Sequence, residues 1–312
     1  MNKLRKIGLT ALGASLVVSS AYAGELSVSG SATLDYTSRS NGSNSNPLSM
    51  GNSVKFTGSG ELDNGTTFTA YWELDNDVMD DYNMNFGLPN DMGTITFIGD
   101  SGLAGGIGKV ADIVPTAFEE VYDVTDAVDN GIATYTLSTN PNIGYTWSGA
   151  GLMLSAHYNP EATAGTGSDS ETSYGATYEV PGMDGLMIAA GTASNDVHSD
   201  INTLGAKYTV GGVTAAYQWT ETDNTTTNTD QIGTHYGISF AINENLTVSA
   251  GRMDVEFKGS PTLVDETNTG FSASYTMGGM TIGATLNEEE NSDGSSTAKD
   301  VQTSILNLAF AF

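Results

Sequence analysis

The chain has 312 residues, with 37 acidic residues against 10 basic ones, a net charge of −27 and no cysteine. So acidic a chain argues against nucleic acid as a partner, because phosphate contacts require Lys and Arg. Without cysteine, disulfides are excluded as a source of stability. Intrinsic disorder is disfavoured, because 14 Tyr, 10 Phe and 3 Trp recur in a regular alternation.

Residues 1–23 have the three parts of a cleavable secretory signal peptide. A basic start is followed by a short apolar stretch at 7–18 and by the small-x-small site Ala21-Tyr22-Ala23. A retained membrane anchor is the weaker alternative, because a spanning helix needs about 20 apolar residues. We expect a mature chain of one domain over 24–312, whose net charge falls to −30 as three basic residues leave with the signal.

The mature chain alternates with a period of two residues, which is typical of β-strands with two unlike faces. In 26–36, apolar or small residues at even positions alternate with mostly polar residues at odd positions. This pattern predicts sixteen strands, at 25–36, 52–63, 66–75, 81–88, 93–100, 141–148, 152–159, 170–180, 185–194, 200–210, 213–221, 230–241, 245–257, 266–277, 280–288 and 299–312.

The connections between these strands alternate between short and long. The short ones are 63–65, 89–92, 149–151, 181–184, 211–212, 242–244 and 278–279, and most contain the Gly, Asn or Asp of tight hairpins. The long ones are 37–51, 76–80, 101–140, 160–169, 195–199, 222–229, 258–265 and 289–298. Short periplasmic turns and long extracellular loops indicate an all-β fold, a transmembrane antiparallel β-barrel.

A soluble β-sandwich is the alternative fold, because it also has many short strands. Two features favour the barrel: polar faces made mostly of Ser, Thr, Gly and Ala, and aromatic residues near the strand ends. The candidate interfacial aromatics are Tyr36, Trp72, Tyr82, Trp147, Tyr158, Tyr174, Tyr178, Tyr208, Trp219 and Tyr275.

Three segments resemble the Gram-negative general porin family: the first strand from Gly24, the strand at 94–100 before a long third loop, and the last strand ending in Phe312. The resemblance covers 24–312. It implies a homotrimer of sixteen-stranded barrels in the outer membrane of a Gram-negative bacterium, among lipid and lipopolysaccharide. It also implies a third loop that folds inward, and a terminal strand read by the barrel-insertion machinery. Small residues that could form the trimer face are Gly30, Ala32, Gly58, Gly60, Ala309 and Ala311.

The 101–140 connection is the candidate pore constriction, because so long a loop in a compact protein is usually functional or disordered. Its acidic residues are Asp112, Glu119, Glu120, Asp123, Asp126 and Asp129, opposed by Lys109 alone. Acidic groups in a narrow pore raise the local cation concentration and slow anions. A solvated external loop is the alternative.

Four basic residues are predicted to line the opposite wall: Arg39, Lys55, Lys207 and Arg252. By resemblance, they would set up a transverse field across the pore. For Arg252 to point inward, the strand needs a bulge near Gly251. A second break in register is expected near Ile305-Leu306, where the apolar positions change from odd to even. The alternative is isolated lumen charges with local partners such as Glu61 or Asp254.

Signals of an enzyme or a metal site are weak. Gly108-Lys109 lacks the leading Gly and the following Ser or Thr of a phosphate loop. His157, His198 and His235 lie in distant segments, so no catalytic or metal-ligating set is predicted. The 289–300 segment copies part of a calcium-loop spacing, but a solvated acidic loop is favoured. No cofactor is expected, although the acidic loops could bind Ca²⁺ or Mg²⁺ weakly.

The sequence therefore predicts a water-filled pore for passive diffusion of small hydrophilic solutes and ions, with a preference for cations. One alternative is a substrate-specific nutrient channel that binds its solute through 101–140 and Tyr71. The other is a non-conducting barrel that serves as a surface adhesin or receptor.

Overall fold

The computed structural model describes residues 24–40, 46–75, 78–99, 104–124, 141–160, 170–195, 199–224 and 230–312. The expected signal peptide and the residues Asp126, Asp129 and His198 lie outside these ranges. Among the described residues, no helix is long and apolar enough to cross a membrane.

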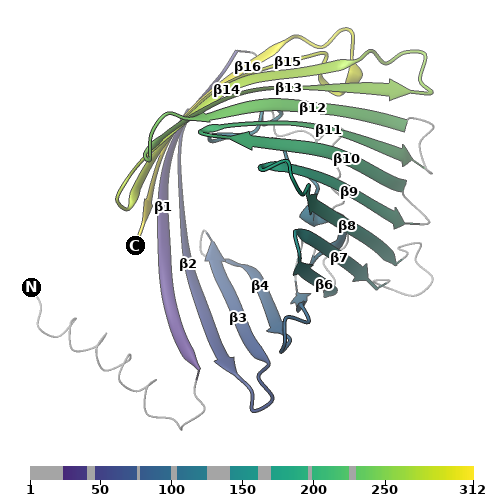
Figure 1. The fold of residues 1–312 in the computed structure, drawn as a ribbon. Helices are drawn as coiled ribbons and strands as arrows, with labels where there is room; N and C mark the ends of the chain where they lie inside the picture. The colour runs from purple at the N-terminus through teal and green to yellow at the C-terminus, as the bar shows by residue number, and fades with distance from the viewer. Residues whose placement is uncertain are drawn as a thin grey trace, which may run out of the picture.

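Sixteen antiparallel strands form one closed barrel (Figure 1), which confirms the predicted fold class and strand number. The strands are β1 (Glu25–Arg39), β2 (Leu48–Glu61), β3 (Thr67–Asp75), β4 (Val78–Gly87), β5 (Thr94–Ile98), β6 (Asn142–Gly149), β7 (Leu152–Asn159), β8 (Glu171–Glu179), β9 (Leu186–Asn195), β10 (Ser199–Val210), β11 (Val213–Asn224), β12 (Asp230–Ala241), β13 (Leu246–Lys258), β14 (Glu266–Met277), β15 (Met280–Glu290) and β16 (Val301–Ala311). Two short 3₁₀ turns are η1 (Gly106–Lys109) and η2 (Ser292–Gly294). Each strand pairs with its neighbours in sequence, and β1 pairs with β16 to close the wall.

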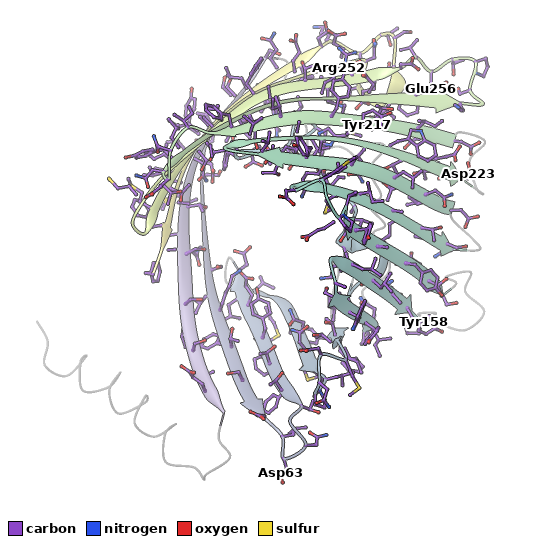
Figure 2. The ribbon with its side chains drawn as sticks, viewed as in Figure 1. Asp63, Tyr158, Tyr217, Asp223, Arg252 and Glu256 are labelled. Carbon is purple, nitrogen blue, oxygen red and sulfur yellow. The ribbon has the colours of Figure 1, made fainter. Side chains whose placement is uncertain are left out.

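The short turns lie at one end of the barrel and the long connections at the other. Asp63 lies in the short turn between β2 and β3, whereas Asp223 and Glu256 lie toward the long-loop ends of β11 and β13 (Figure 2). This arrangement follows from the turn chemistry, because hairpins of two to five residues need Gly, Asn or Asp at the tight positions.

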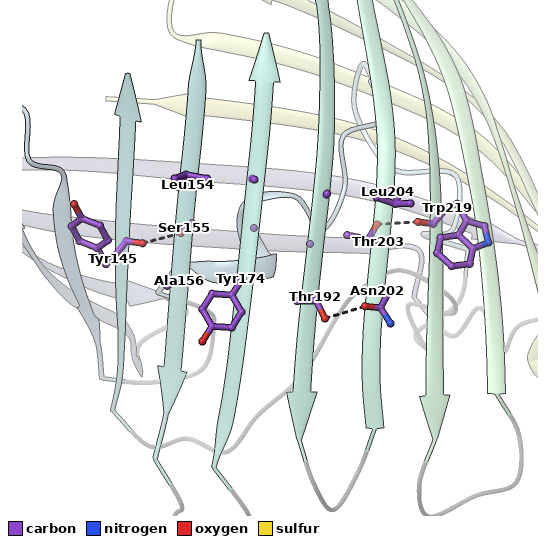
Figure 3. Close-up of a pocket in the computed structure, with 14 residues that line it drawn as sticks. Tyr145, Leu154, Ser155, Ala156, Tyr174, Thr192, Asn202, Thr203, Leu204 and Trp219 are labelled. Carbon is purple, nitrogen blue, oxygen red and sulfur yellow. Dashed lines mark hydrogen bonds between the residues drawn. The ribbon is translucent and has the colours of Figure 1, made fainter. Parts of the chain in front are cut away.

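The pairing register keeps one face of the strands outward, with one register shift between β3 and β4 at Trp72/Leu74. All ten predicted interfacial aromatics are on the outward face; Trp72 is 41% exposed and Tyr174 is 56% exposed. The outward surface of β6–β11 also has an apolar groove of ≈ 610 Å³, bordered by large side chains such as Tyr145, Tyr174 and Trp219 (Figure 3). Its lining includes the small residues Ala156, Ala176 and Ala190. Since this groove faces away from the lumen, it belongs to the lipid-facing surface and not to the pore.

The predicted break in register at Ile305-Leu306 is wrong. Strand β16 pairs continuously with β1 and β15, so every odd residue from Val301 to Ala311 faces inward. Apolar side chains such as Ile305 are tolerated there because the inner wall at this height is covered by protein. Thr303, two residues away, donates a hydrogen bond of 2.6 Å to the Val124 carbonyl.

Candidate pore constriction

Segment 104–124, the described part of the third long loop, lies inside the barrel along the inner wall from β6 to β16. Inward side chains of the strands bind its backbone. Gly106 N–H donates to Ser155 Oγ at 2.9 Å, and the Gln218 amide of β11 bonds to Ile113 and to two carbonyl groups of the segment. Further along, Asn287 Nδ2 of β15 donates to the Glu120 carbonyl at 2.6 Å. Because buried backbone groups must be paired, these inward polar side chains fix the path of the segment.

Inward glycines make room for the backbone and side chains of this segment. We call this set the glycine floor: Gly144, Gly175, Gly191, Gly205, Gly237, Gly251, Gly270 and Gly283. A Cβ on Gly191 would lie 2.7 Å from Val110 Cγ2, and a Cβ on Gly175 would overlap the Gly106 carbonyl oxygen. Gly175 and Gly191 are directly opposite each other in neighbouring strands. Glycine within a strand often marks such a close approach of another backbone.

Apolar side chains of the segment pack on this floor. Ile107 and Val110 are fully buried and form a cluster with Ala193 and Ile201 of the wall. A second cluster joins Val121 to the inward residues of β13. Full burial of one such side chain contributes roughly 1.5–3 kcal/mol, so the clusters hold the segment firmly to the wall.

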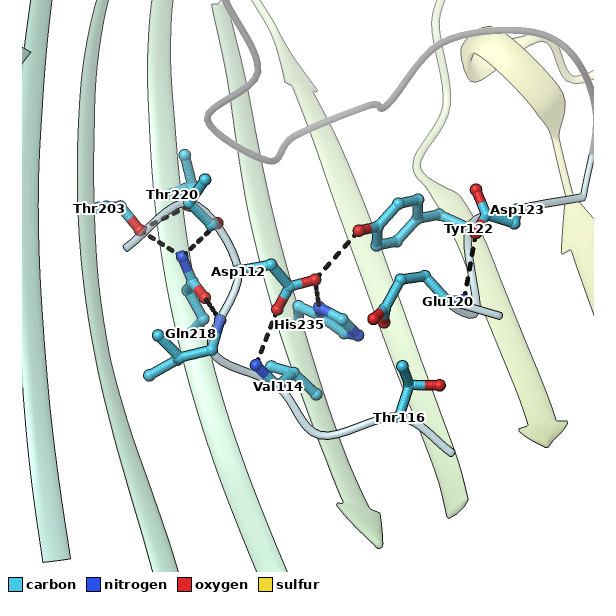
Figure 4. A network of polar contacts seen from close by, with 12 residues as sticks. Asp112, Val114, Thr116, Glu120, Tyr122, Asp123, Thr203, Gln218, Thr220 and His235 are labelled. Carbon is cyan, nitrogen blue, oxygen red and sulfur yellow. Dashed lines mark hydrogen bonds and ion pairs between the residues drawn. The ribbon is translucent and has the colours of Figure 1, made fainter. Parts of the chain in front are cut away.

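The four described acidic residues of the segment are half-buried in the lumen: Asp112, Glu119, Glu120 and Asp123. Asp112 accepts hydrogen bonds from the Val114 amide at 2.7 Å and the Tyr122 hydroxyl at 3.1 Å (Figure 4). Asp123 Oδ2 accepts from the Glu120 amide at 3.1 Å. The carboxylates are therefore held by the local fold of the segment itself.

Two of these carboxyls titrate near neutral pH. Burial, with a smaller contribution from Asp123 and Asp35, raises the pKa of Glu119 to about 7. Burial, followed by the charges of Asp112, Asp123 and Glu119, raises the pKa of Glu120 to about 8. Burial beside Asp112 also raises the pKa of the Tyr122 hydroxyl, which keeps it protonated as a donor. The charge of the segment thus changes over the physiological range of pH.

Lys55 lies on the inward face of β2, opposite Glu73 of β3. Its Nζ is 3.0 Å from Glu73 Oε2 and 5.7 Å from the centre of the Tyr71 ring, whose hydroxyl donates to the same carboxylate. The side chain of Lys55 is 43% exposed and faces the water of the lumen, whereas that of Glu73 is only 11% exposed. The local partner of Lys55 is therefore Glu73, which was not among the local partners named from the sequence.

Arg39 and Lys207 also face inward, but at the two ends of the barrel. Arg39 is opposite Thr303 near the long-loop end of β1. Lys207 is opposite Ala216, close to the short turn at 211–212, and lines a pocket among the short turns. Of the inward basic residues on the described strands, Lys55 is the one in the middle of its strand.

Arg252 faces outward, and the predicted bulge near Gly251 is absent. The register of β13 is continuous with both neighbouring strands through Gly251 and Arg252. The Arg252 guanidinium binds Asp254 on the outer surface, with Nη2 2.6 Å from Oδ1. Gly251 has another role, since it lies in the glycine floor against Val121. The apolar inward residues Met253 and Val255, which suggested a register change, pack on Val121.

The sequence reasoning missed the glycine floor and the buried pair of His157 and Glu171 beneath η1, whose Nδ1 and Oε1 atoms are 3.7 Å apart. Repeated glycines at inward mid-strand positions were the available signal.

The residues at 289–300 that resemble a calcium loop do not form a cage for an ion. Glu289 is buried on the inward face of β15, and the Asp293 amide is bound to Glu266 instead.

These features define a transmembrane β-barrel whose third long loop crosses its lumen. The sequence profile of Gram-negative porins matches residues 8–310, and the chain belongs to this family. No curated protein matches the sequence. The family and the fold make it an outer-membrane channel and not an enzyme.

Solved porin structures share this fold at low sequence identity. A triple mutant of Rhodopseudomonas blastica porin is 16% identical, with a TM-score of 0.66, and the match covers 92% of this chain and 100% of that one. A refined porin structure has the same identity, TM-score and coverage. A structure described as an engineered protein with asymmetric conductivity is 17% identical, with a TM-score of 0.65 and the same coverage.

Proposed function

We propose that this porin conducts small hydrophilic solutes and ions by passive diffusion and prefers cations. The observation that carries the proposal is the position of segment 104–124, which holds four carboxyl groups inside the lumen. A barrel of sixteen strands is wide enough for an aqueous channel. Where a folded segment narrows that channel, its carboxylates raise the local concentration of cations.

The opposing positive charge is small. Lys55 is neutralised locally by Glu73, Lys207 lies toward the short turns, and Arg252 is outside the barrel. A strong transverse field, which the family resemblance implied, would need several cations in the middle of the wall. We therefore expect the acidic segment to dominate the selectivity.

Single-channel recording in planar bilayers under a KCl gradient tests the proposal. We expect stepwise conductance and a reversal potential on the cation side, which moves toward zero in the triple variant Glu119→Gln, Glu120→Gln, Asp123→Asn. The matched control removes three outward carboxylates, in Glu256→Gln, Glu288→Gln and Glu290→Gln, and should leave the reversal potential unchanged.

Other outcomes would favour the alternatives. Block of the current by one particular solute would favour a substrate-specific channel. A folded barrel without conductance would favour an adhesin or receptor and would end the porin proposal. Equal effects of the inward and outward triple variants would show that the selectivity does not come from segment 104–124.

We also propose that the mature protein starts at Gly24 and assembles as a homotrimer. Ala32 and Gly58 are on the outward face of β1 and β2, where small residues allow close approach of a neighbour. The Phe312 ring covers Gly30, and Ala309 faces inward, so neither contributes. Native mass spectrometry tests both points: three copies of a chain that lacks residues 1–23 are expected. We also propose that the barrel contacts lipid and lipopolysaccharide, and that the barrel-insertion machinery inserts it into the membrane.

A further inference from the structure

Three side chains with metal-binding atoms converge where segment 104–124 crosses β12. Asp112 and Glu120 come from the segment and His235 from the strand (Figure 4). One ligand atom from each lies within 4.8 Å of the other two. Within the part of the chain that the structure describes, this is the one group of three or more such residues. Two of them are the acidic residues that the pore proposal uses, but His235 has no part in that proposal.

His235 is buried without hydrogen-bonding partners. The residue is 3% exposed, and neither ring nitrogen has a hydrogen bond to any described residue. Its Nδ1 is 3.4 Å from Asp112 Oδ2, and its ring packs edge-on against Tyr122. Because buried polar groups are normally hydrogen-bonded, an imidazole of this kind suggests a missing ligand.

The surroundings orient the carboxylates. Asp112 is held by the Val114 amide through Oδ1 and by the Tyr122 hydroxyl through Oδ2. Outer hydrogen bonds of this type are typical of carboxylates that bind metals. Glu120 and His235 also border a small cavity of ≈ 10 Å³, about the space that one water molecule or ion needs.

We propose that Asp112, Glu120 and His235 bind a divalent transition-metal ion of the Zn²⁺ class and tie the loop to β12. Tetrahedral bonds of about 2.0–2.1 Å give ligand atoms about 3.3 Å apart, close to the distance between Asp112 Oδ2 and His235 Nδ1. One imidazole and two carboxylates leave a fourth position for water from the lumen. The imidazole distinguishes this site from an oxygen-only site for Ca²⁺ or Mg²⁺.

Isothermal titration of ZnCl₂ into the detergent-solubilised, chelator-treated full-length barrel tests the site, and it does not depend on the selectivity of the pore. We expect one Zn²⁺ per chain. His235→Gln should weaken binding at least tenfold, and so should Glu120→Gln, whose side chain is only half-buried. His157→Gln is the matched control, because it alters another buried inward histidine and should bind Zn²⁺ as the wild type does. Circular dichroism establishes that each variant retains the barrel.

Three results would overturn the proposal. Folded wild-type protein that takes up no Zn²⁺ would leave His235 as a partner of Asp112 alone. The binding site would lie elsewhere if both folded site variants bound Zn²⁺ with the wild-type affinity. The same would follow if His157→Gln lost as much Zn²⁺ affinity as the two site variants. Displacement of Zn²⁺ by millimolar Ca²⁺ would show that the carboxylates act without the imidazole.

Discussion

The two sides of the inner wall differ, although both follow the same alternation of residues. On β6–β15 the inward mid-strand positions include the glycine floor, and they are covered by segment 104–124. On β2 and β3 the corresponding positions carry Tyr71, Glu73 and Lys55, and the Lys55 side chain is exposed to the water of the lumen. The inward residues of a barrel therefore depend on what they face, a protein segment or water.

This difference also separates stability from selectivity. A glycine within a strand costs about 0.5–1 kcal/mol. On the covered side, this cost is offset by the burial of residues such as Ile107 and Val110. On the open side, charged residues contribute little to stability but act on every ion that passes. Changes on the two sides should accordingly alter different measurements.

The largest effect is expected from Gly175→Leu in the glycine floor. The new side chain would overlap the Gly106 carbonyl oxygen and push the segment off the wall. Overpacking of this kind typically costs about 1–3 kcal/mol, so the free energy of unfolding in urea should fall by that amount. Trypsin should also cut faster after Lys109, which lies in the displaced segment.

The control for this change is Ala176→Leu, one residue further along β8 and on the outward face. It adds a larger side chain to the lipid-facing surface and should leave both unfolding and the cleavage rate at Lys109 unchanged. If the two variants were equally stable, the glycine floor would not be a packing surface.

Lys55→Gln should have the next largest effect, on selectivity. It leaves the Glu73 carboxylate without its partner at 3.0 Å. A unit charge about 7 Å from the ion path changes the energy of an ion by about 0.6 kcal/mol in water. Removal of the positive charge of Lys55 should therefore raise the cation preference roughly threefold. Lys207→Gln should shift the reversal potential less, because Lys207 is near the short turns. The opposite ranking would contradict the structural placement of the two lysines.

The pH dependence should be more modest. In the presence of chelator, raising the pH from 6 to 9 removes protons from Glu119 and Glu120, whose pKa values are about 7 and about 8. Since both values are raised, the groups are largely neutral at pH 6 and charged at pH 9. Cation preference should therefore rise with pH. A double variant with Gln at both positions should show a flat profile over this range, and an unchanged slope would assign the titration to other groups.

The smallest effect is expected from Arg252→Gln on the outer surface. Exposed ion pairs typically contribute about 0.2–1 kcal/mol, and the Arg252–Asp254 pair is partly exposed on both sides. The free energy of unfolding should change by no more than this, and the reversal potential should stay constant. A clear shift in selectivity would mean that Arg252 reaches the ion path, against the register of β13.

Much of the fold follows from the sequence because a period of two fixes which face of each strand meets lipid. The sixteen strands, the ten outward aromatics and the inward position of Lys55 all come from this alternation. The loop at 101–140 was also identifiable, from its length and its charge.

The two register breaks were mispredicted for one physical reason. Inward apolar residues such as Val255 and Ile305 look like lipid-facing residues if the lumen is assumed to be wet. They are inward because a protein segment covers that part of the wall. The convergence of His235 with Asp112 was equally out of reach, because it depends on where a long loop crosses a distant strand.

The pairing of Gly30 with Phe312 also has a consequence for the order of events in biogenesis. Each residue donates its amide to the carbonyl of the other, at 2.8 and 3.0 Å, and the Phe312 ring lies over Gly30. Until β16 has been delivered, β1 keeps an unpaired edge, which is prone to pair with other chains. Closure must therefore wait for the export of β16, and the Gly30–Phe312 pairing is a long-range contact that forms late in assembly.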